Sequence, residues 1–442
     1  MAFSGRVAGV FGTRLVQLTV TVLATFVLAR LLGPEGRGVY TVLMLVPTTL
    51  FALAQLGLPS SLVFHAGRGG RLGDLERHTL LLGLAVSAVA VAATFVALPI
   101  LEATVLRTAP IDLLPIALLV LPIRMVATLA GSVLYGRQRF RVYNLILTGQ
   151  SVAWLLLVVA IVGGLGLGVA GALWAYVLFT AGGAILVMLE LDRLRRRESR
   201  SSAGDTHGVT TLEVSGYGLR LYPASVGTFF GYRADVFLLG WLIGSSSEIG
   251  IYSVAVSLAE LVFNVPDSIG TVLFPRVAAM SRDDADRLAP SMSRVTVLVT
   301  AAAAVLLAPV AAVALAVFLP AFLPGIVPLV VILPGIVSLS VAKVLTSYLS
   351  GTEQLRPVAV AAIVSLAVNV AANIVLIPTA GITGAAAASL VSYTVYAVLM
   401  VRAAAAVSSR PWSEFVVPGA SDVGRVATAL ARLGARLSGR VA

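Results

Sequence analysis

Residues 79–101 read TLLLGLAVSAVAVAATFVALPIL, a run in which no side chain carries a charge. As an α-helix rising about 1.5 Å per residue, such a run is long enough to cross the hydrocarbon core of a bilayer, which is about 30 Å thick. The stretch therefore predicts a membrane-spanning helix, and it directs the search for others like it along the chain.

The composition of the whole chain indicates that the lipid bilayer is its main solvent. Of the 442 residues, 59% are hydrophobic and only 12% are charged, whereas about a quarter of the residues in soluble domains are charged. No soluble fold hides that much apolar surface, which excludes a soluble enzyme and a nucleic-acid-binding module. We attribute the net charge of +11 to cytoplasmic loops and anionic lipid, and we expect no nucleic-acid partner.

A window of about 20 residues moved along the chain finds twelve apolar spans. Several of them contain proline, which helices embedded in lipid tolerate and which marks kinks. The sequence therefore predicts an all-α polytopic membrane protein with twelve transmembrane helices. The predicted spans are residues 9–32, 39–64, 79–101, 111–135, 142–163, 169–191, 215–242, 250–275, 294–319, 325–350, 357–377 and 382–402.

The arginines predict the orientation of these spans. Alternate loops are rich in arginine, and the loops between them hold only Arg37 and Arg107, with Arg30 at the end of the first span. By the positive-inside rule, the arginine-rich loops and both termini are cytoplasmic. The unbroken alternation also supports an even number of spans. The arginine-rich loops are residues 65–78, 137–141, 193–210, 276–293 and 351–356.

The two halves of the chain carry similar turns in the same order. The triplets Leu31-Leu32-Gly33 and Gly38-Val39-Tyr40 recur as Leu242-Ile243-Gly244 and Gly250-Ile251-Tyr252, and two further glycine-rich turns also recur. Chance likeness between such turns is the alternative reading. A parallel repeat of six spans, related by an axis along the membrane normal, is typical of alternating-access transporters, with a cavity between two lobes. We predict an N-terminal lobe at 1–192, a cytoplasmic linker at 193–211, a C-terminal lobe at 212–403 and a basic cytoplasmic tail at 404–442.

The tail has a pattern of its own. Apolar residues recur at steps of three and four, and four arginines lie off this stripe. The pattern fits an amphipathic helix on the anionic inner leaflet, and a solvated disordered tail fits equally well. The apolar stripe is Val423, Val426, Leu430, Leu433 and Leu437, and the arginines are Arg425, Arg432, Arg436 and Arg440.

Ionisable side chains inside the spans are candidates for function, because each costs a few kcal/mol to insert. Arg124 falls near the bilayer midplane and is the best candidate for a buried contact with an anion. Arg14 and Arg220 lie about one turn from the cytoplasmic face, where snorkelling to the headgroups explains them equally well. The complete set is Arg14, Arg124, Arg220, Arg233, Asp235, Glu260, Asp267 and Lys343.

Two readings stay open for the charges of the seventh and eighth spans. Arg233 and Asp235 are two residues apart, so they point to nearly opposite sides of one helix. Each can pair with a neighbouring helix, for instance Arg233 with Glu260, and only hold the bundle together. In the other reading Arg233 holds an anionic substrate, while Asp235 or Glu260 takes up a proton or a sodium ion.

The sequence lacks the residues of common catalytic and metal sites. It has no cysteine, and its three histidines, His65, His78 and His207, fall in predicted loops without metal-ligand spacing. It contains no P-loop, GxSxG or HExxH motif, and the predicted extracytoplasmic loops are too short for a catalytic domain. We expect a protein that is not an enzyme, with no catalytic residues, no metal and no cofactor.

Two stretches resemble a known family. Residues 30–64, RLLGPEGRGVYTVLMLVPTTLFALAQLGLPSSLVF, resemble the first helix pair of the polysaccharide-transport branch of the multidrug/oligosaccharidyl-lipid/polysaccharide exporter superfamily. Residues 232–258, YRADVFLLGWLIGSSSEIGIYSVAVSL, are the related stretch of the second half, where Asp235 matches an acid common in that helix. The resemblance covers residues 5–402. Its turn motifs are moderately specific for the superfamily and weak for the substrate.

The resemblance implies a flippase for lipid-linked oligosaccharides carried on undecaprenyl pyrophosphate. It implies that Arg124, Arg233 and Lys343 bind the pyrophosphate, because arginine matches phosphate in fork geometry, with Arg14 and Arg220 at the cytoplasmic entrance. It also implies coupling to Na⁺ or H⁺ through Asp235 or Glu260. The expected partners are the lipid-linked substrate, anionic lipids and other membrane proteins of polysaccharide assembly, and the expected location is the bacterial inner membrane.

Two alternatives remain. Lipid II flippases of the superfamily typically have fourteen spans, which disfavours that substrate. Multidrug or cation antiporters of the same fold often have twelve, but their cavities often rely on acids, and the first half here has no acid in mid-membrane. A membrane-embedded glycan polymerase or ligase, the third reading, would need a large extracytoplasmic loop.

Overall fold

The structure is a computed structural model that describes residues 2–200 and 208–437. The side chains of residues 2–15, 199–200, 217–232 and 429–437, and most of those between 271 and 279, lie outside the described part. Throughout the described residues all regular secondary structure is helical. The predicted all-α class is therefore confirmed.

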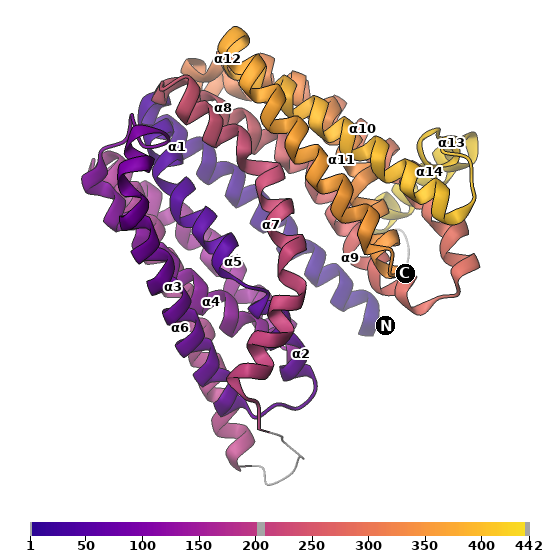
Figure 1. The fold of residues 1–442 in the computed structure, drawn as a ribbon, viewed down its shortest axis with the longest axis horizontal. Coiled ribbons are helices and arrows are strands. Elements are labelled where there is room, and N and C mark those ends of the chain that lie inside the picture. The colour runs from indigo at the N-terminus through magenta and orange to yellow at the C-terminus, as the bar shows by residue number, and fades with distance from the viewer. Residues whose placement is uncertain (1, 201–207, 438–442) are drawn as a thin grey trace. The chain divides into compact units, whose positions relative to one another are not determined.

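The first compact unit consists of Met1–Phe229 together with Gly244–Ile251. Its α4 packs on α2, α3 and α6, and α1 packs on α5 (Figure 1). Its elements are α1 (Ala2–Ala54), α2 (Leu58–Gly67), α3 (Leu72–Ala103), the 3-10 turn η1 (Ile111–Leu113), α4 (Leu114–Gly136), α5 (Phe140–Leu157), the π-helical turn η2 (Val158–Gly164), α6 (Gly168–Arg200), the first part of α7 (Thr211–Leu242) and the first part of α8 (Ser246–Ala259).

The second compact unit consists of Phe230–Ile243 and Tyr252–Ala442. Here α11 packs along α10, α12 and α9 (Figure 1). After the ends of α7 and α8, its elements are η3 (Glu260–Phe263), α9 (Asn264–Ala279), α10 (Arg282–Phe318), η4 (Pro320–Gly325), α11 (Ile326–Gly351), α12 (Leu355–Ser408), α13 (Ser413–Val416) and α14 (Ala420–Leu437). The lobe boundaries proposed from the sequence stay a prediction.

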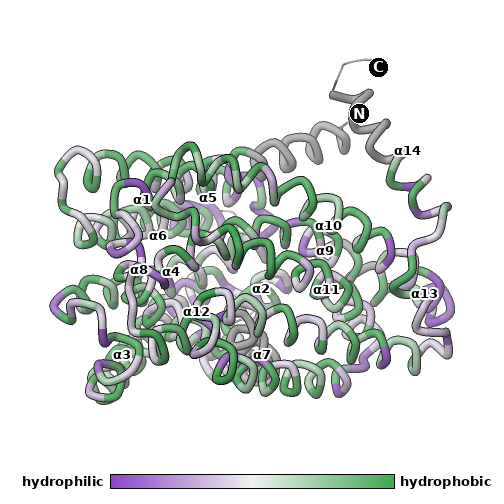
Figure 2. Tube along the Cα trace, turned by 90° about the horizontal axis from the view of Figure 1, so that it is seen from above, coloured by the Kyte–Doolittle hydropathy of each residue, from purple (hydrophilic) through white to green (hydrophobic). Residues whose placement is uncertain are grey.

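Nine helices in the described residues are long and apolar enough to cross a membrane. Two of them, α1 and α12, are far longer than one crossing needs. The 54 residues of α12 correspond to about 80 Å of helix. Each bends at a glycine with a left-handed φ, Gly33 in α1 (φ 65°) and Gly381 in α12 (φ 56°), where a residue with a Cβ would be strained. The chain is thus a multi-pass membrane protein, and its helices are hydrophobic along most of their length (Figure 2).

Two predicted spans are wrong in detail. The span 39–64 is broken, because α1 ends at Ala54, Leu56 and Gly57 adopt positive φ, and α2 starts afresh with Pro59 in its first turn. The span 250–275 is divided by the 3-10 turn η3. Neither break interrupts the apolar window of about 20 residues, although Gln55, Gly57 and Pro59 lie at the first and Glu260 and Asn264 at the second.

The histidine prediction also needs correction. His65 lies in α2 and His78 in α3, because both helices extend beyond the apolar stretches that predicted them. His78 is buried, and its Nε2 lies 2.7 Å from the carbonyl oxygen of Val209. His207 lies outside the described residues.

Ion pairs join helices of the first unit at the end where the arginine-rich loop 137–141 lies. Arginines after α4 reach acids on α6: Arg137 lies 3.0 Å from Glu198, and Arg139 lies 2.8 Å from Glu190. The arginine-rich loops are therefore partly neutralised within the protein. Apolar packing of Leu62, Leu75, Leu129 and Leu191 begins directly inside this layer.

Candidate functional site

Asp235 is a buried carboxylate near the end of α7. Asp235 is only 4% exposed, and its carboxylate accepts hydrogen bonds from Tyr252 Oη at 2.5 Å and from the backbone N–H of Val236 at 2.8 Å. Among the ion pairs of the described residues, none includes Asp235. A buried carboxylate without a cation partner is costly in its charged form, so the site is suited to taking up a cation.

Arg233, two residues earlier, takes a different partner. Its guanidinium lies 3.6 Å from Glu260 in η3, and both side chains are only partly exposed. The structure thus contains the ion pair that the sequence offered as the stabilising alternative. It also shows that Arg233 and Asp235 have separate partners, as their two-residue spacing predicts.

Lys343 of α11 is also paired. Its Nζ lies 2.6 Å from Asp267 of α9 and 4.3 Å from the centre of the Phe263 ring. Arg233 and Lys343 are therefore both compensated by acids of the same unit. To hold an anionic ligand, either one has to share its charge or exchange its partner.

The same unit holds a cluster of buried polar side chains on α12. Ser392 Oγ accepts a hydrogen bond of 2.9 Å from Asn369 Nδ2. Asn373 Nδ2 donates to Asn369 Oδ1 at 3.0 Å, and Asn373 Oδ1 is a buried acceptor without a partner in the described residues. Sequence reasoning missed Tyr252 as the partner of Asp235. The recurrence of Tyr40 as Tyr252 was the one available signal.

Arg124 of α4 has a different environment in the first unit. Its guanidinium carbon lies 4.3 Å from the centre of the Phe51 ring, a cation–π contact. The side chain is partly buried, and it belongs to no ion pair formed between described residues. It is a cation held by an aromatic ring rather than by a carboxylate, and its charge is available to an anion.

Arg14 and Arg220 cannot be placed in the same way. Their helices, α1 and α7, are described, but their side chains lie outside the described residues. Their role at the cytoplasmic entrance stays a prediction.

The repeated turns of the two halves meet inside the first unit. A Cβ added at Gly38 would lie 1.6 Å from the carbonyl oxygen of Ser246, and one added at Gly250 would lie 1.9 Å from that of Pro34. Gly38 and Gly250 are counterparts in the sequence repeat, so the contact is reciprocal. Only glycine permits backbones to come this close.

An open groove of about 670 Å³ runs between α3, α4 and α6, lined mainly by apolar side chains such as Leu84, Pro122 and Ile185. Its two acids, Glu76 and Asp192, are paired with Arg195. With so few convergent polar groups, the groove does not suit a charged ligand. Arg124 and Asp235 therefore stay the candidates for a functional site.

Comparison with known proteins adds a family and a fold. A family described as "Polysaccharide biosynthesis protein" matches residues 27–323, more than half of the chain. No curated protein matches the sequence significantly.

Solved transporter structures share the fold. A structure of the lipid II flippase MurJ in an inward closed conformation matches with a TM-score of 0.71 at 12% identity, covering 92% of this chain and 89% of that one. An inward-facing multidrug resistance MATE family transporter of the MOP superfamily matches at 0.60 and 17% identity, covering 88% and 95%. A MOP superfamily transporter from Pyrococcus furiosus, described as having a binding pocket of reverse polarity, matches at 0.51 and 16%, covering 90% and 94%. At these identities the likeness establishes the fold.

Proposed function

The chain belongs to the polysaccharide biosynthesis protein family, and from this premise we propose that it is a lipid-linked oligosaccharide flippase. It moves an undecaprenyl-pyrophosphate-linked oligosaccharide, the precursor of a cell-surface polysaccharide, from the inner to the outer leaflet of the bacterial inner membrane. It does so by alternating access, as a transporter rather than an enzyme.

The observation that carries this proposal is the environment of Arg124. A guanidinium inside a span costs a few kcal/mol, and here no acid among the described residues offsets that cost. A ligand with negative charge supplies the missing partner, and a pyrophosphate fits the fork of the guanidinium. Arg233 and Lys343 join in binding when Glu260 and Asp267 release them.

The topology that we propose has twelve spans with both termini in the cytoplasm. Counting the kinked helices α1 and α12 twice and adding α7 to the candidate spans supports this number. The alternation of arginine-rich loops supports the orientation. The reciprocal contact of Gly38 and Gly250 then lies on the extracytoplasmic side, where it has to open for release.

Coupling to an ion gradient belongs to the same proposal. Asp235 is the group that takes up H⁺ or Na⁺, because it is buried and its described partners are the hydroxyl of Tyr252 and a backbone N–H. Glu260 is coupled to it through Arg233, whose charge Glu260 offsets. Uptake of a cation at Asp235 changes the net charge of the cluster, which gives the ion a way to influence anion binding.

The second candidate is a multidrug or cation antiporter of this fold. The acids Asp235, Glu260 and Asp267 of the second unit favour it. Arg124 argues against it, because a positive charge that no described acid offsets repels a cationic drug. A glycan polymerase or ligase is less favoured still, because the predicted outer loops are short.

Mass spectrometry of polyprenyl-linked glycans in cells that lack the protein tests the proposal. We expect one undecaprenyl-pyrophosphate oligosaccharide to accumulate and wild type to relieve the accumulation. Arg124→Ala should not relieve it, whereas Arg141→Ala, at an exposed arginine of α5, should act as wild type. An unchanged lipid pool in cells without a second flippase would contradict the proposal, and drug efflux would be the next assay.

A further inference from the structure

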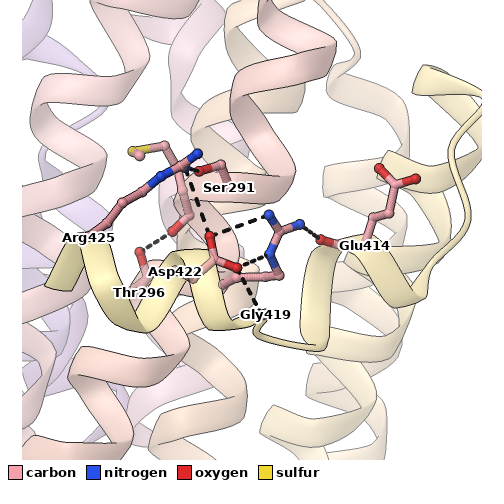
Figure 3. A network of polar contacts seen from close by, with 8 residues as sticks. Ser291, Thr296, Glu414, Gly419, Asp422 and Arg425 are labelled. Atoms are coloured by element: carbon pink, nitrogen blue, oxygen red, sulfur yellow. Dashed lines mark hydrogen bonds and ion pairs between the residues drawn. The ribbon is translucent and has the colours of Figure 1, made fainter. Parts of the chain in front are cut away.

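The chain beyond α12 is fastened to α10 by a buried ion pair. Arg294 of α10 donates from Nε to Asp422 Oδ2 at 2.6 Å, and its Nη1 donates to the carbonyl oxygen of Glu414 (Figure 3). The N–H of Gly419 donates to the same carboxylate at 3.0 Å. One arginine thus holds α13 and the first turn of α14 at a defined place on α10.

This anchor is part of the core of the second unit. Asp422 is completely buried, and Phe415 of α13 is buried beside α10. Arg294 keeps the pKa of the Asp422 carboxyl below its ordinary value, because it hydrogen-bonds the charged form. The contact neutralises the only acid of α14, so the charge left on this helix is positive.

The depth of the anchor places the tail at the membrane boundary. Arg294 is the first residue of the predicted span 294–319, so Asp422 lies where α10 enters the apolar layer. The start of the tail supports the same depth. Trp412 comes four residues after Ser408, the last residue of α12, so the two residues are at most about 14 Å apart along the chain.

Large apolar side chains of the tail are exposed. Trp412, Val417 and Val423 are 61%, 59% and 54% exposed, and Arg425 is exposed next to them. Beyond Asp422 the sequence contains four arginines and no acid. Tryptophan favours the interface of a bilayer, and arginines beside an apolar stripe favour anionic headgroups.

We propose that the segment from Trp412 to the end of α14 binds the surface of an anionic lipid bilayer, with the Arg294–Asp422 pair fixing it at headgroup depth. The stripe that begins with Val423 enters the headgroup region, and the arginines contact lipid phosphates. The occupant is the cytoplasmic leaflet of the membrane that the protein spans, because the charge, the exposed tryptophan and the depth of the anchor agree on it.

The absence of cysteine from the chain makes a direct test possible in the full-length protein. Val423→Cys carries an environment-sensitive nitrobenzoxadiazole label, and Thr428→Cys, exposed about 140° around the helix from it, is the matched control. Both are compared in nanodiscs of phosphatidylcholine with and without phosphatidylglycerol. We expect a blue shift and quenching by lipid-borne spin labels at position 423 only, strongest with phosphatidylglycerol and weakened by salt.

Charge removal tests the lipid preference separately. The double variant Arg432→Gln/Arg436→Gln should reduce partition of the tail into the anionic surface by roughly thirtyfold, since each basic residue contributes roughly fivefold. A label at 423 that stays in water in anionic nanodiscs would overturn the proposal. So would one that is shielded equally in detergent and in both lipids, because this points to a protein partner or a second copy.

Discussion

The two units treat charge inside the membrane in opposite ways. In the first unit Arg124 rests on the ring of Phe51 without an acid among its described contacts. In the second, Arg233 and Lys343 each lie against a carboxylate, at 3.6 and 2.6 Å. Among the described residues, the first unit thus leaves this cation without an acid, while the second unit pairs both of these cations with carboxylates.

The largest effect is expected from placing a carboxylate beside the arginine of the first unit, as the second unit has beside Arg233 and Lys343. Phe51→Glu places a carboxylate beside Arg124, and the new ion pair should lower flipping by about a hundredfold, equivalent to nearly 3 kcal/mol of lost anion binding. Rates in proteoliposomes measure this. Phe51→Gln controls for polarity and Phe51→Leu for loss of the ring, and both should keep most of the activity. Equal loss in all three would show that packing at Phe51, and not the free charge, matters.

Next in size is the loss of the unpaired acid of the second unit. Asp235→Asn keeps the shape and the hydrogen bond from Tyr252 but removes the ionisable group, so flipping should fall about tenfold and no longer respond to a gradient. Proteoliposomes with an imposed pH or Na⁺ gradient report this. Tyr252→Phe should retain the gradient response at a lower rate. A gradient response that persists in Asp235→Asn would exclude this carboxylate as the coupling group.

The third largest effect is expected at the close backbone contact between Gly250 and Pro34 in the first unit. Gly250→Ala puts a methyl group where the carbonyl oxygen of Pro34 lies, so the free energy of unfolding should fall by about 3 kcal/mol. Gly149→Ala, a helical glycine with nothing within 4 Å of the added Cβ, should cost nothing. Chemical unfolding in detergent measures both. Equal stability of the two variants would mean that the turns separate freely.

The Arg233–Glu260 ion pair should contribute less to the free energy of unfolding than the close contact at Gly250, because both of its side chains are partly exposed. A double-mutant cycle with Arg233→Gln and Glu260→Gln should give a coupling energy of about 1 kcal/mol or less. If the pair only holds the bundle, the double variant should flip normally. If Arg233 also binds substrate, the double variant should stay inactive although its stability recovers, and flipping assays on the same preparations decide between these outcomes.

The smallest effect is expected at the tail, and it depends on pH. The pKa of Asp422 is lower in the folded protein than its ordinary value of 3.8, through the hydrogen bond from Arg294. The contribution of charged Asp422 to the free energy of unfolding is therefore complete above about pH 4. It is lost as the pH falls through the lowered pKa of the folded protein. Hydrogen exchange of residues 411–428 should accelerate below that pH. Asp422→Asn should exchange fast at every pH, and a protected tail in that variant would contradict the role of the anchor.

The sequence by itself determined much of the fold. Apolar runs such as 79–101 predicted helices that the structure contains, and the kinks at Gly33 and Gly381 fall between predicted spans. It also indicated that Arg124 stands apart, because no acid lies in mid-membrane in the first half. These inferences succeed because partition into lipid is decided largely residue by residue, so that composition along a short window is sufficient.

Only the tertiary structure decided which groups meet. Nothing near Asp235 in the sequence indicates that Tyr252 is its partner, and Asp422 pairs with an arginine 128 residues away. The same limit explains the broken span 39–64, where Gln55, Gly57 and Pro59 are too few to interrupt an apolar window of about 20 residues. Contacts between helices depend on packing angles and on where each helix bends, and these are set by side chains distant in sequence. The sequence therefore predicts which helices carry the charges, and the tertiary structure determines which of these charges have a partner.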